Sequence, residues 1–393
     1  MRIAILCNEM KPVPAVDGGA VETLVDLLIE NNEKEQKLRI DVFSKDSERA
    51  LSKSKTIKNT NFYFIHYSQN LEKIVNLLNK FLGRLRLRKI FHPYIFNAVK
   101  ELKKQEYDWI IIENRPLYVG FVKKNKKEAK IALHLHNDTI NIDRSDSKNI
   151  VKLCDKVLSV SEYINNRVKE VCSTDKELEK AIVLENRINV NKFKTKKMNS
   201  QFLRVKYNIP SEENILIYHG RVIEEKGVLE LIKAFGKAIV KNPSLHLFII
   251  GELNDKSYEE KLRIAINRLP LNKVLMIGYV NHAELPKYLD SANIIVLPSL
   301  GDEAFGLTIV ESMAMKKPVI STNVGAIPEI LSDNCGVLVE NDEHLVPNLA
   351  KEILSLVSNS DKQQVLSNNG REKAVLAYNS ENYLSDLINK LKL

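Results

Sequence analysis

The chain has 393 residues, 44% of them hydrophobic and 28% charged, which predicts a folded globular protein of two domains and excludes disordered and collagen-like classes. The net charge of +9 comes from the first half, where residues 1–200 hold 38 Lys and Arg against 26 Asp and Glu. No apolar run is long enough for a signal peptide or a membrane span, so we expect a cytoplasmic protein.

Short apolar segments alternate with helical patterns along the chain, which indicates parallel sheets flanked by helices. Seven strands are expected in the first half, at residues 2–6, 40–44, 62–65, 109–112, 131–136, 157–160 and 182–184. Six more are expected in the second half, at residues 215–219, 245–250, 274–277, 294–297, 318–321 and 336–339. Apolar residues at helical spacing over 228–239 predict a crossover helix, and a short amphipathic helix is expected near residues 382–393.

The strand pattern restarts after the polar stretch at residues 186–201, which places a linker between two domains near residues 187–205. The alternation of strand and helix in both halves predicts two doubly wound α/β domains. Ligands of such domains bind at the carboxyl ends of the strands, so we expect the functional site in a cleft between the two domains.

Residues 298–314 carry the strongest motif, with Glu303 and Glu311 eight positions apart where a loop enters a helix. A helix that starts near Phe305 presents free amides that can hold a diphosphate. Glu311 would lie about one and a half turns inside that helix, within reach of ribose hydroxyls. Glu303 precedes the helix and would face the transferred sugar. The alternative is an ordinary helix start stabilised by nearby acids.

A second motif closes the strand expected at residues 215–219 and opens the next helix. It reads His-Gly-Arg-Val-Ile-Glu-Glu-Lys-Gly over residues 219–227. Arg221 and Lys226 are candidates for stabilising the negative charge on a departing nucleoside diphosphate. As isolated residues they would more often be surface charges, because Arg and Lys are mostly exposed.

Two segments of the first half add further candidates. Gly18 and Gly19 lie between the opening strand and a helix, where backbone amides can approach a phosphate or sugar, although a plain turn explains them equally well. His134 and His136 lie two residues apart at the end of a strand. They could ligate a metal, but no carboxylate or cysteine set with ligand spacing accompanies them, and a structural role is the alternative.

The motif at residues 298–314 resembles the signature of glycosyltransferase family 4, whose members are retaining enzymes of the GT-B fold, and residues 318–329 continue the resemblance. It implies two Rossmann-like, doubly wound parallel-sheet domains that face each other across a cleft. These would be an acceptor-binding domain at residues 1–195 and a nucleotide-sugar-binding domain at residues 196–375. A C-terminal helix at residues 376–393 would follow, with a return to the first domain as an open alternative.

The resemblance also implies a role for individual residues. Glu303, His136, Arg221 and Lys226 would be catalytic, with His136 contacting the donor sugar and the two cations the diphosphate. The residues expected to bind the donor are Gly18, Gly19, His134, Val280, Phe305, Gly306, Leu307 and Glu311. The reaction would be retaining transfer of a hexose-type sugar from a nucleotide sugar, expected to be a UDP-sugar, to a polysaccharide or glycolipid precursor.

We expect neither a cofactor nor a metal ion. The chain has no clear D-x-D motif, and its four cysteines lack metal-ligand and disulfide spacing. No G-x-G-x-x-G motif follows the first strand, which argues against a nicotinamide or flavin. Two alternatives stay open, a nucleotide-sugar epimerase of the same fold and a non-catalytic accessory subunit of a transferase.

The basic residues of the first half bear on its partners. Residues 51–100 hold ten Lys and Arg and a single acid, and the cations gather at Arg84, Arg86, Arg88 and Lys89. Such a patch suits an anionic membrane, nucleic acid or a phosphorylated acceptor, and a solvated lysine-rich surface is equally compatible. No aromatic-interleaved motif supports nucleic acid, which is not expected as a partner. We expect a glycan or lipid-linked acceptor, with peripheral association at the inner face of the membrane as an open alternative.

Overall fold

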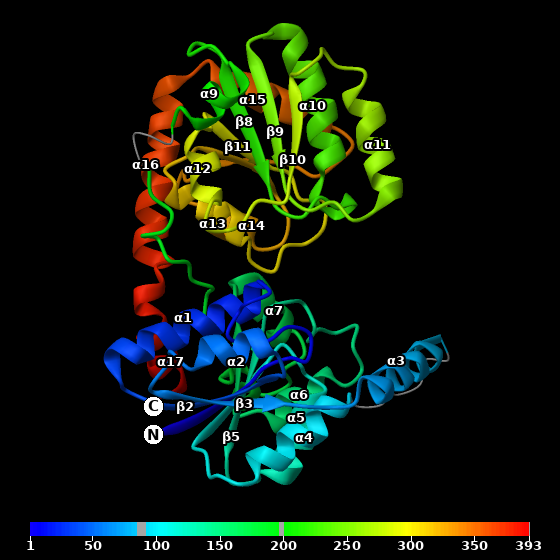
Figure 1. Cartoon of the computed structure of the whole chain (residues 1–393), viewed down its shortest axis with the longest axis vertical. Helices are drawn as coiled ribbons and strands as arrows, with labels where there is room; N and C mark the ends of the chain where they lie inside the picture. The colour runs from blue at the N-terminus through cyan, green and yellow to red at the C-terminus, as the bar shows by residue number, and fades with distance from the viewer. Residues whose placement is uncertain (85–91, 196–199, 393) are drawn as a thin grey trace. The chain divides into compact units, whose positions relative to one another are not determined.

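The computed structural model describes residues 1–84, 92–195 and 200–392, and it divides into two compact units (Figure 1). Unit 1 consists of Met1–Asn186 and the C-terminal segment from Ser380, and unit 2 is Arg187–Asn379. The boundary predicted after residue 195 lies nine residues later in the chain than the observed one, and the boundary predicted after residue 375 lies four residues earlier. The reason is that Arg371 donates a hydrogen bond to the Phe193 carbonyl (2.8 Å), which holds the segment after Asn186 on unit 2.

Unit 1 is built on a seven-stranded parallel sheet with the order β3-β2-β1-β4-β5-β6-β7. Its strands are β1 (Arg2–Leu6), β2 (Arg39–Lys45), β3 (Thr60–Ile65), β4 (Trp109–Glu113), β5 (Lys130–Leu135), β6 (Lys156–Ser159) and β7 (Ala181–Val183). Its helices are α1 (Ala20–Glu35), α2 (Glu48–Ser54), α3 (Gln69–Arg84), α4 (Pro93–Leu102), α5 (Tyr118–Asn125), α6 (Ser147–Leu153), α7 (Glu162–Lys169), α8 (Asp175–Leu178) and α17 (Tyr383–Leu391). The strand order reverses between β1 and β4, where doubly wound domains bind ligands.

Unit 2 repeats this plan with a six-stranded parallel sheet of order β10-β9-β8-β11-β12-β13, which reverses between β8 and β11. Its strands are β8 (Asn214–His219), β9 (Leu245–Ile250), β10 (Val274–Gly278), β11 (Ile294–Leu297), β12 (Val319–Thr322) and β13 (Val337–Val339). Its helices are α9 (Phe202–Tyr207), the 3-10 turn η1 (Glu224–Lys226), α10 (Val228–Lys241), α11 (Lys256–Ile266), α12 (Leu285–Asp290), α13 (Leu307–Ala314), α14 (Ile327–Ile330), α15 (Leu345–Val357) and α16 (Ser360–Ala377).

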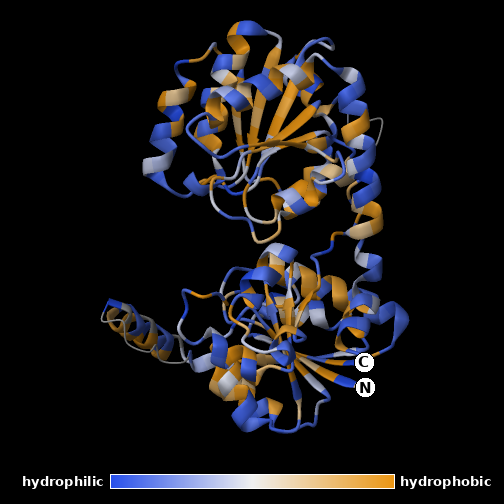
Figure 2. Cartoon of the chain, turned by 180° about the vertical axis from the view of Figure 1, so that it is seen from behind, coloured by the Kyte–Doolittle hydropathy of each residue, from blue (hydrophilic) through white to orange (hydrophobic). Residues whose placement is uncertain are grey.

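The predicted strands are all present, and most of them are apolar segments that the sheet buries, whereas β10 is only partly buried. β4 and β9 are buried along their whole length, as expected where helices cover both faces of a parallel sheet. Figure 2 shows the hydrophobic strands inside each unit and polar residues on the outer helices. The predicted crossover helix is α10, and the helix predicted to start near Phe305 is α13, which begins at Leu307.

The C-terminal helix α17 belongs to the core of unit 1. Its apolar residues Tyr383, Leu384 and Leu387 are buried in one cluster with residues of α1, including Leu24 and Leu28. An Asn31 side-chain amide also donates a hydrogen bond to the Ser380 carbonyl, just before the helix. Helix α17 therefore completes the core of unit 1.

The predicted basic run lies only partly within the described residues. Arg84 ends α3, whereas Arg86, Arg88 and Lys89 lie outside the described residues. None of the helices in the described part of the chain combines the length and the apolar content that a membrane span needs.

Candidate functional site

The loop after β8 packs against the loop after β11 in unit 2. Gly227 lies between η1 and α10 with a left-handed φ of 66°, and a Cβ there would collide with the Pro298 carbonyl oxygen. The backbone amide of Leu300 donates a hydrogen bond of 2.8 Å to the Glu225 carbonyl. This close approach fixes Lys226 beside the loop that follows β11.

Lys226 and Glu303 are in direct contact although 77 residues separate them. The Lys226 ammonium forms an ion pair with Glu303 Oε1, and the Ser299 hydroxyl donates a hydrogen bond of 2.6 Å to the same oxygen. The side chains of Lys226 and Glu303 are partly accessible to solvent, whereas Ser299 is buried. Two of the four predicted catalytic residues therefore form one polar cluster, with Ser299 as a third member.

The start of α13 follows this cluster and lacks a side-chain cap. Its N-cap is Gly306, at a φ of 115°, and no side chain caps the first turn. Uncapped amides at a helix start attract anions, since they are free donors at the positive end of the helix dipole. Leu307 is the first helical residue, but the Phe305 ring is buried edge-on against Tyr378, so only the Phe305 backbone can meet a ligand.

Glu311 lies one turn further along α13 and is buried. Its Oε1 accepts a hydrogen bond of 2.8 Å from His282 Nε2, and its Oε2 lies 3.9 Å from His219 Nδ1. The hydrogen bond to Glu311 raises the pKa of His282, whereas burial lowers the pKa of His219 to about 4. His282, which lies just after the predicted Val280, was not a predicted site residue.

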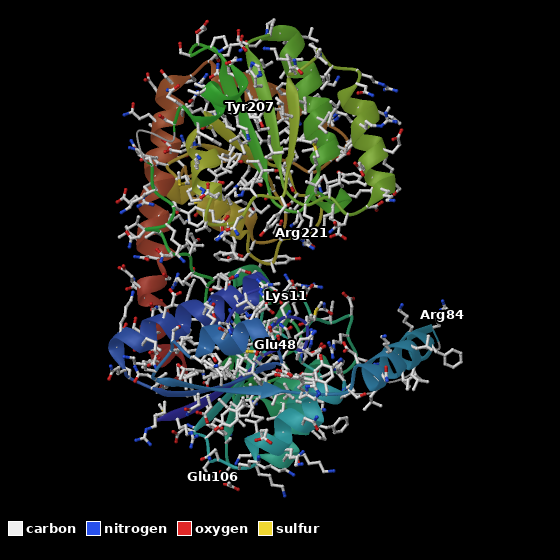
Figure 3. The ribbon with its side chains drawn as sticks, viewed as in Figure 1. Lys11, Glu48, Arg84, Glu106, Tyr207 and Arg221 are labelled. Carbon is white, nitrogen blue, oxygen red and sulfur yellow. The ribbon has the colours of Figure 1, made fainter. Side chains whose placement is uncertain are left out.

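Arg221 lies on a different part of the same loop, with its side chain exposed at the lower edge of unit 2 in Figure 3. The Tyr218 hydroxyl donates a hydrogen bond of 2.6 Å to the Arg221 carbonyl and fixes the backbone there. An open pocket of about 510 Å³ adjoins this position. It is lined by Arg221, Ile223, Glu252, Asn254, Asp255 and Lys256.

The two predicted histidines belong to unit 1, where they share a buried carboxylate. His136 Nε2 lies 2.8 Å and His134 Nδ1 3.1 Å from Glu113 Oε2. Burial opposes ionisation of Glu113, but the two histidines outweigh it and lower the pKa of Glu113 to about 2. Burial lowers the pKa of His136, which is therefore neutral at neutral pH. Its buried Nδ1 has no hydrogen-bond partner among the residues that the structure describes.

The expectation that no carboxylate accompanies the histidines is wrong, because Glu113 ends the neighbouring strand β4. Glu113 and His134 are partners in the register of β4 and β5. The ligand atoms of Glu113, His134 and His136 lie within 4.8 Å of one another, a group that could hold a metal ion. The same contacts are those of a carboxylate accepting two imidazole N–H groups, which satisfies the buried charge without a metal.

Gly18 and Gly19 lie at the start of α1, as predicted. Gly19 is the N-cap of α1, and its Cα approaches the Glu22 carboxylate so closely that a Cβ would collide with it. Glu22 accepts a hydrogen bond of 3.0 Å from the Asn8 amide, and burial raises the pKa of Glu22. This pair connects the glycine turn to the segment that follows β1.

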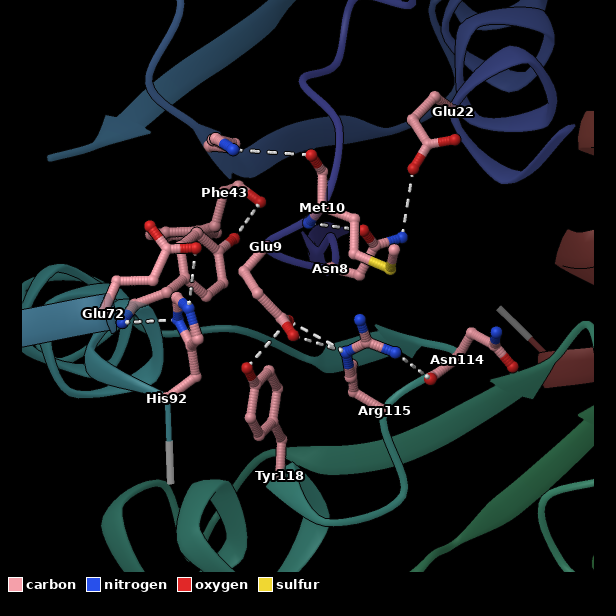
Figure 4. Close-up of polar contacts among 12 residues, drawn as sticks. Asn8, Glu9, Met10, Glu22, Phe43, Glu72, His92, Asn114, Arg115 and Tyr118 are labelled. Carbon is pink, nitrogen blue, oxygen red and sulfur yellow. Dashed lines mark hydrogen bonds and ion pairs between the residues drawn. The ribbon is translucent and has the colours of Figure 1, made fainter. Parts of the chain in front are cut away.

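A further polar cluster near the ends of β1 and β4 was not predicted from the sequence (Figure 4). Glu9 receives hydrogen bonds of 2.8 Å from both Arg115 Nε and the Tyr118 hydroxyl. Burial opposes ionisation of Glu9, but Arg115 and Tyr118 lower its pKa. Its members come from segments about 106 residues apart, which explains why no local motif indicates the cluster.

Comparisons with known proteins agree with this fold. The family model described as glycosyl transferases group 1 matches residues 199–373. The chain is 22% identical over 389 residues to Spore coat protein SA of Bacillus subtilis, covering 95% of this chain and 94% of the relative. It is 27% identical over 241 residues to the Staphylococcus aureus capsular polysaccharide biosynthesis glycosyltransferase CapM, covering 56% of this chain and 61% of CapM.

A solved structure shares the fold over the whole chain. The Anabaena protein Alr3699/HepE, in complex with UDP-glucose, superposes with a TM-score of 0.74 at 19% identity, covering 100% of this chain and 99% of HepE. The predicted α/β fold class with two Rossmann-like, parallel-sheet domains of the GT-B type is confirmed. Residues 199–373, which make up most of unit 2, therefore match the group 1 glycosyltransferase family.

Proposed function

We propose that this chain transfers a hexose-type sugar from a UDP-sugar with retention of configuration, and that unit 2 binds the donor. The observation that carries the proposal is the contact of Lys226 with Glu303, next to the uncapped start of α13. A cation and free amides suit the two phosphates of a nucleotide sugar, and a carboxylate beside them suits the hydroxyls of its sugar.

The chemical step requires charge stabilisation more than proton transfer by a side chain. As the bond between the anomeric carbon and the β-phosphate oxygen breaks, the nucleoside diphosphate takes the electron pair and gains negative charge. Lys226, Arg221 and the α13 amides stabilise that charge in the proposed complex. The acceptor hydroxyl attacks from the face that the phosphate leaves, and the phosphate takes its proton. The configuration is then retained without an enzymic nucleophile.

The remaining binding groups follow from the same placement. Glu311 accepts hydrogen bonds from the ribose, with His282 holding its carboxylate in position. In unit 1, His136 keeps a lone pair on Nδ1 that can accept a hydrogen bond from a sugar hydroxyl. Gly18 and Gly19 offer backbone amides in the same unit.

The choice of donor and acceptor class rests on the similar proteins. HepE, with the same fold, was solved with UDP-glucose, which supports a UDP-hexose donor. CapM acts in capsular polysaccharide biosynthesis, which supports a polysaccharide or glycolipid precursor as acceptor. We place the reaction in the cytoplasm, where nucleotide sugars are made available.

A donor screen tests the proposal. Purified protein is incubated with UDP-, GDP- and ADP-hexoses, with and without a membrane extract, and nucleoside diphosphate release is measured. We expect release from a UDP-hexose that depends on the extract, and a product with the anomeric configuration of the donor. Release from no nucleotide sugar, or an inverted product, would contradict the proposal.

The same screen separates the two alternatives. An epimerase would consume the donor at full rate without any acceptor. An accessory subunit would release nothing alone and regain activity only with a partner transferase. The proposed enzyme releases diphosphate at a low rate alone and faster when extract is added.

We also propose that the transfer needs no metal ion, because side-chain cations can stabilise the charge of the diphosphate instead. Activity should be unchanged after incubation with EDTA and gel filtration. Loss of activity on chelation, with recovery on adding Mn²⁺ or Zn²⁺, would contradict this and would direct attention to Glu113, His134 and His136.

A further inference from the structure

Helix α3 is attached to unit 1 along one side only. Val75 is buried on that side, and Glu72 forms an ion pair with His92 (3.4 Å). Figure 1 shows the rest of the helix extending outward from the body of unit 1. A helix of 16 residues therefore presents much of its circumference to its surroundings.

The outward side of α3 is apolar. Its large hydrophobic side chains are strongly exposed, at 48% for Leu71, 55% for Ile74, 70% for Leu77, 42% for Leu78 and 59% for Phe81. At about 100° per residue, these five positions fall within roughly a third of the helix circumference. Exposed apolar residues scattered singly are ordinary, but a continuous stripe of this kind marks an interaction surface. We call these five residues the α3 stripe.

A row of cations borders the α3 stripe. Lys73, Lys80 and Arg84 lie within about 40° of one another and next to Leu77 on the helix wheel. Arg84 is labelled at the outer end of the helix in Figure 3. Among the described residues, none of the three forms an ion pair with a carboxylate. The single acid of the helix, Glu72, is held by His92 instead.

We propose that α3 lies in the surface of an anionic lipid bilayer, with the α3 stripe among the acyl chains and the cation row at the phosphate level. This arrangement of an apolar face bordered by Lys and Arg is the one that interfacial helices use. A second copy of the chain is the less suitable occupant, because self-association through the stripe would bring two rows of like charge together. The proposal does not depend on the identity of the sugar or the acceptor.

Docking through α3 extends the proposed function by giving the enzyme a location. A lipid-linked acceptor is confined to the membrane surface, so an enzyme held there by unit 1 meets it at a high local concentration. The donor-binding residues of unit 2 take no part in this contact. Membrane binding and catalysis can therefore be measured independently.

The most direct test introduces a fluorescent reporter into the stripe. The chain has one tryptophan, Trp109, which is buried in β4. We expect Leu77→Trp to show a blue-shifted emission on adding vesicles of phosphatidylglycerol and phosphatidylcholine, and to be quenched by brominated acyl chains. The matched control is Val240→Trp, on α10 of unit 2, where Val240 is 82% exposed. We expect no shift and no quenching in the control.

Vesicle sedimentation of the full chain measures separately how much the α3 stripe and the cation row contribute to membrane binding. Leu77→Glu should weaken binding to anionic vesicles at least about tenfold, because it removes a large apolar side chain and adds a repelled charge. Val240→Glu should bind as the natural sequence does. Lys73→Ala with Lys80→Ala should weaken binding roughly tenfold or more at low salt, and less at high salt.

Three results would overturn the proposal. One is equal emission of Leu77→Trp with and without anionic vesicles, and another is equal sedimentation of the natural sequence and Leu77→Glu. The third is a dimer in analytical ultracentrifugation without lipid that Leu77→Glu dissociates, because the occupant would then be a second copy. Because none of these readouts involves a sugar, failure here would leave the donor screen unaffected.

Discussion

Both units bring polar groups together where the strand order reverses, but unit 1 also has a buried carboxylate, Glu113, at the end of β4. In unit 2, the loops after β8 and β11 meet at the reversal of strand order and bring Lys226 to Glu303. In unit 1, the segments after β1 and β4 meet at the corresponding reversal and bring Glu9 to Arg115. Both pairs are partly accessible, and the unit 2 pair lies next to an uncapped helix start. Glu113 of unit 1 is instead buried and shared by two histidines.

The Lys226–Glu303 pair is available to a ligand, whereas Glu113 stabilises the fold. An accessible ion pair contributes little stability, so its main value lies in what it can bind. A buried carboxylate must be satisfied within the protein, so its main value lies in stability and in positioning its partners. Changes in unit 2 should therefore affect turnover, and changes at Glu113 should affect unfolding.

The largest effect is expected for Lys226→Ala. It removes the cation that would stabilise the departing diphosphate, and kcat should fall about 100-fold to 1,000-fold with little change in the free energy of unfolding. Glu303→Gln should also reduce kcat strongly. Steady-state kinetics with the donor found in the screen give both values. Lys237→Ala, on the exposed side of α10, is the matched control. Near-normal turnover of Lys226→Ala would contradict the assignment of the unit 2 cluster to turnover.

The next effect is expected for Glu113→Gln, which should lower the free energy of unfolding by on the order of 3 kcal/mol at pH 7. The pKa of Glu113 is about 2 in the folded chain against an ordinary 4.5. Its contribution is thus present above about pH 4.5 and is lost as the pH falls toward 2. Urea unfolding at pH 7 and pH 3 measures both values.

The exposed Glu128 provides the control for this change, as Glu128→Gln. A difference between natural sequence and Glu113→Gln that stays constant down to pH 3 would show that the ionised carboxylate is not responsible. A loss of turnover without any loss of stability would instead place Glu113 with the ligand-binding groups.

A smaller effect is expected for Glu311→Gln. Since Glu311 is proposed to bind the ribose equally in the ground state and the transition state, the donor KM should rise about tenfold while kcat changes little. Kinetics at saturating acceptor separate the two constants. A fall in kcat with an unchanged KM would mean that Glu311 acts on the reacting centre instead.

The smallest effect is expected for His282→Ala. The pKa of His282 is raised by its hydrogen bond to Glu311, so the pair stabilises the fold below the ordinary pKa of histidine. That contribution is lost as the pH rises through the raised pKa. The difference in unfolding free energy between the natural sequence and His282→Ala should therefore be larger at pH 5.5 than at pH 8.5, and a difference that grows with pH would contradict the assignment.

The sequence predicted the parts of the molecule that are encoded locally. The strands follow from short apolar runs, and Lys226, Glu303 and Glu311 follow from two continuous motifs. The start of α13 was predicted near Phe305 and lies at Leu307, because Phe305 turns into the core against Tyr378 before the helix begins. The proposed roles of these residues stay predictions.

The missed features depend on residues that are distant in the sequence. Glu113 is 21 residues from His134. The only indication in the sequence was a carboxylate at the end of an apolar strand, β4, and β4 pairs with the strand that carries His134. To predict His282 as a site residue, one would have to know where the loop after β10 lies relative to α13. The α3 stripe was hidden for another reason, since a sequence pattern shows that a helix is amphipathic but does not show whether another element covers its apolar face.

Nucleoside diphosphate binding by the full chain tests the central claim most directly. Isothermal titration calorimetry with UDP, and with GDP and ADP in parallel, should show one preferred nucleotide for the natural sequence. Lys226→Ala and Arg221→Ala should each raise the Kd for that nucleotide at least about tenfold, and Lys237→Ala should leave it unchanged. Unchanged affinity in both Lys226→Ala and Arg221→Ala would contradict the assignment of these cations to the diphosphate.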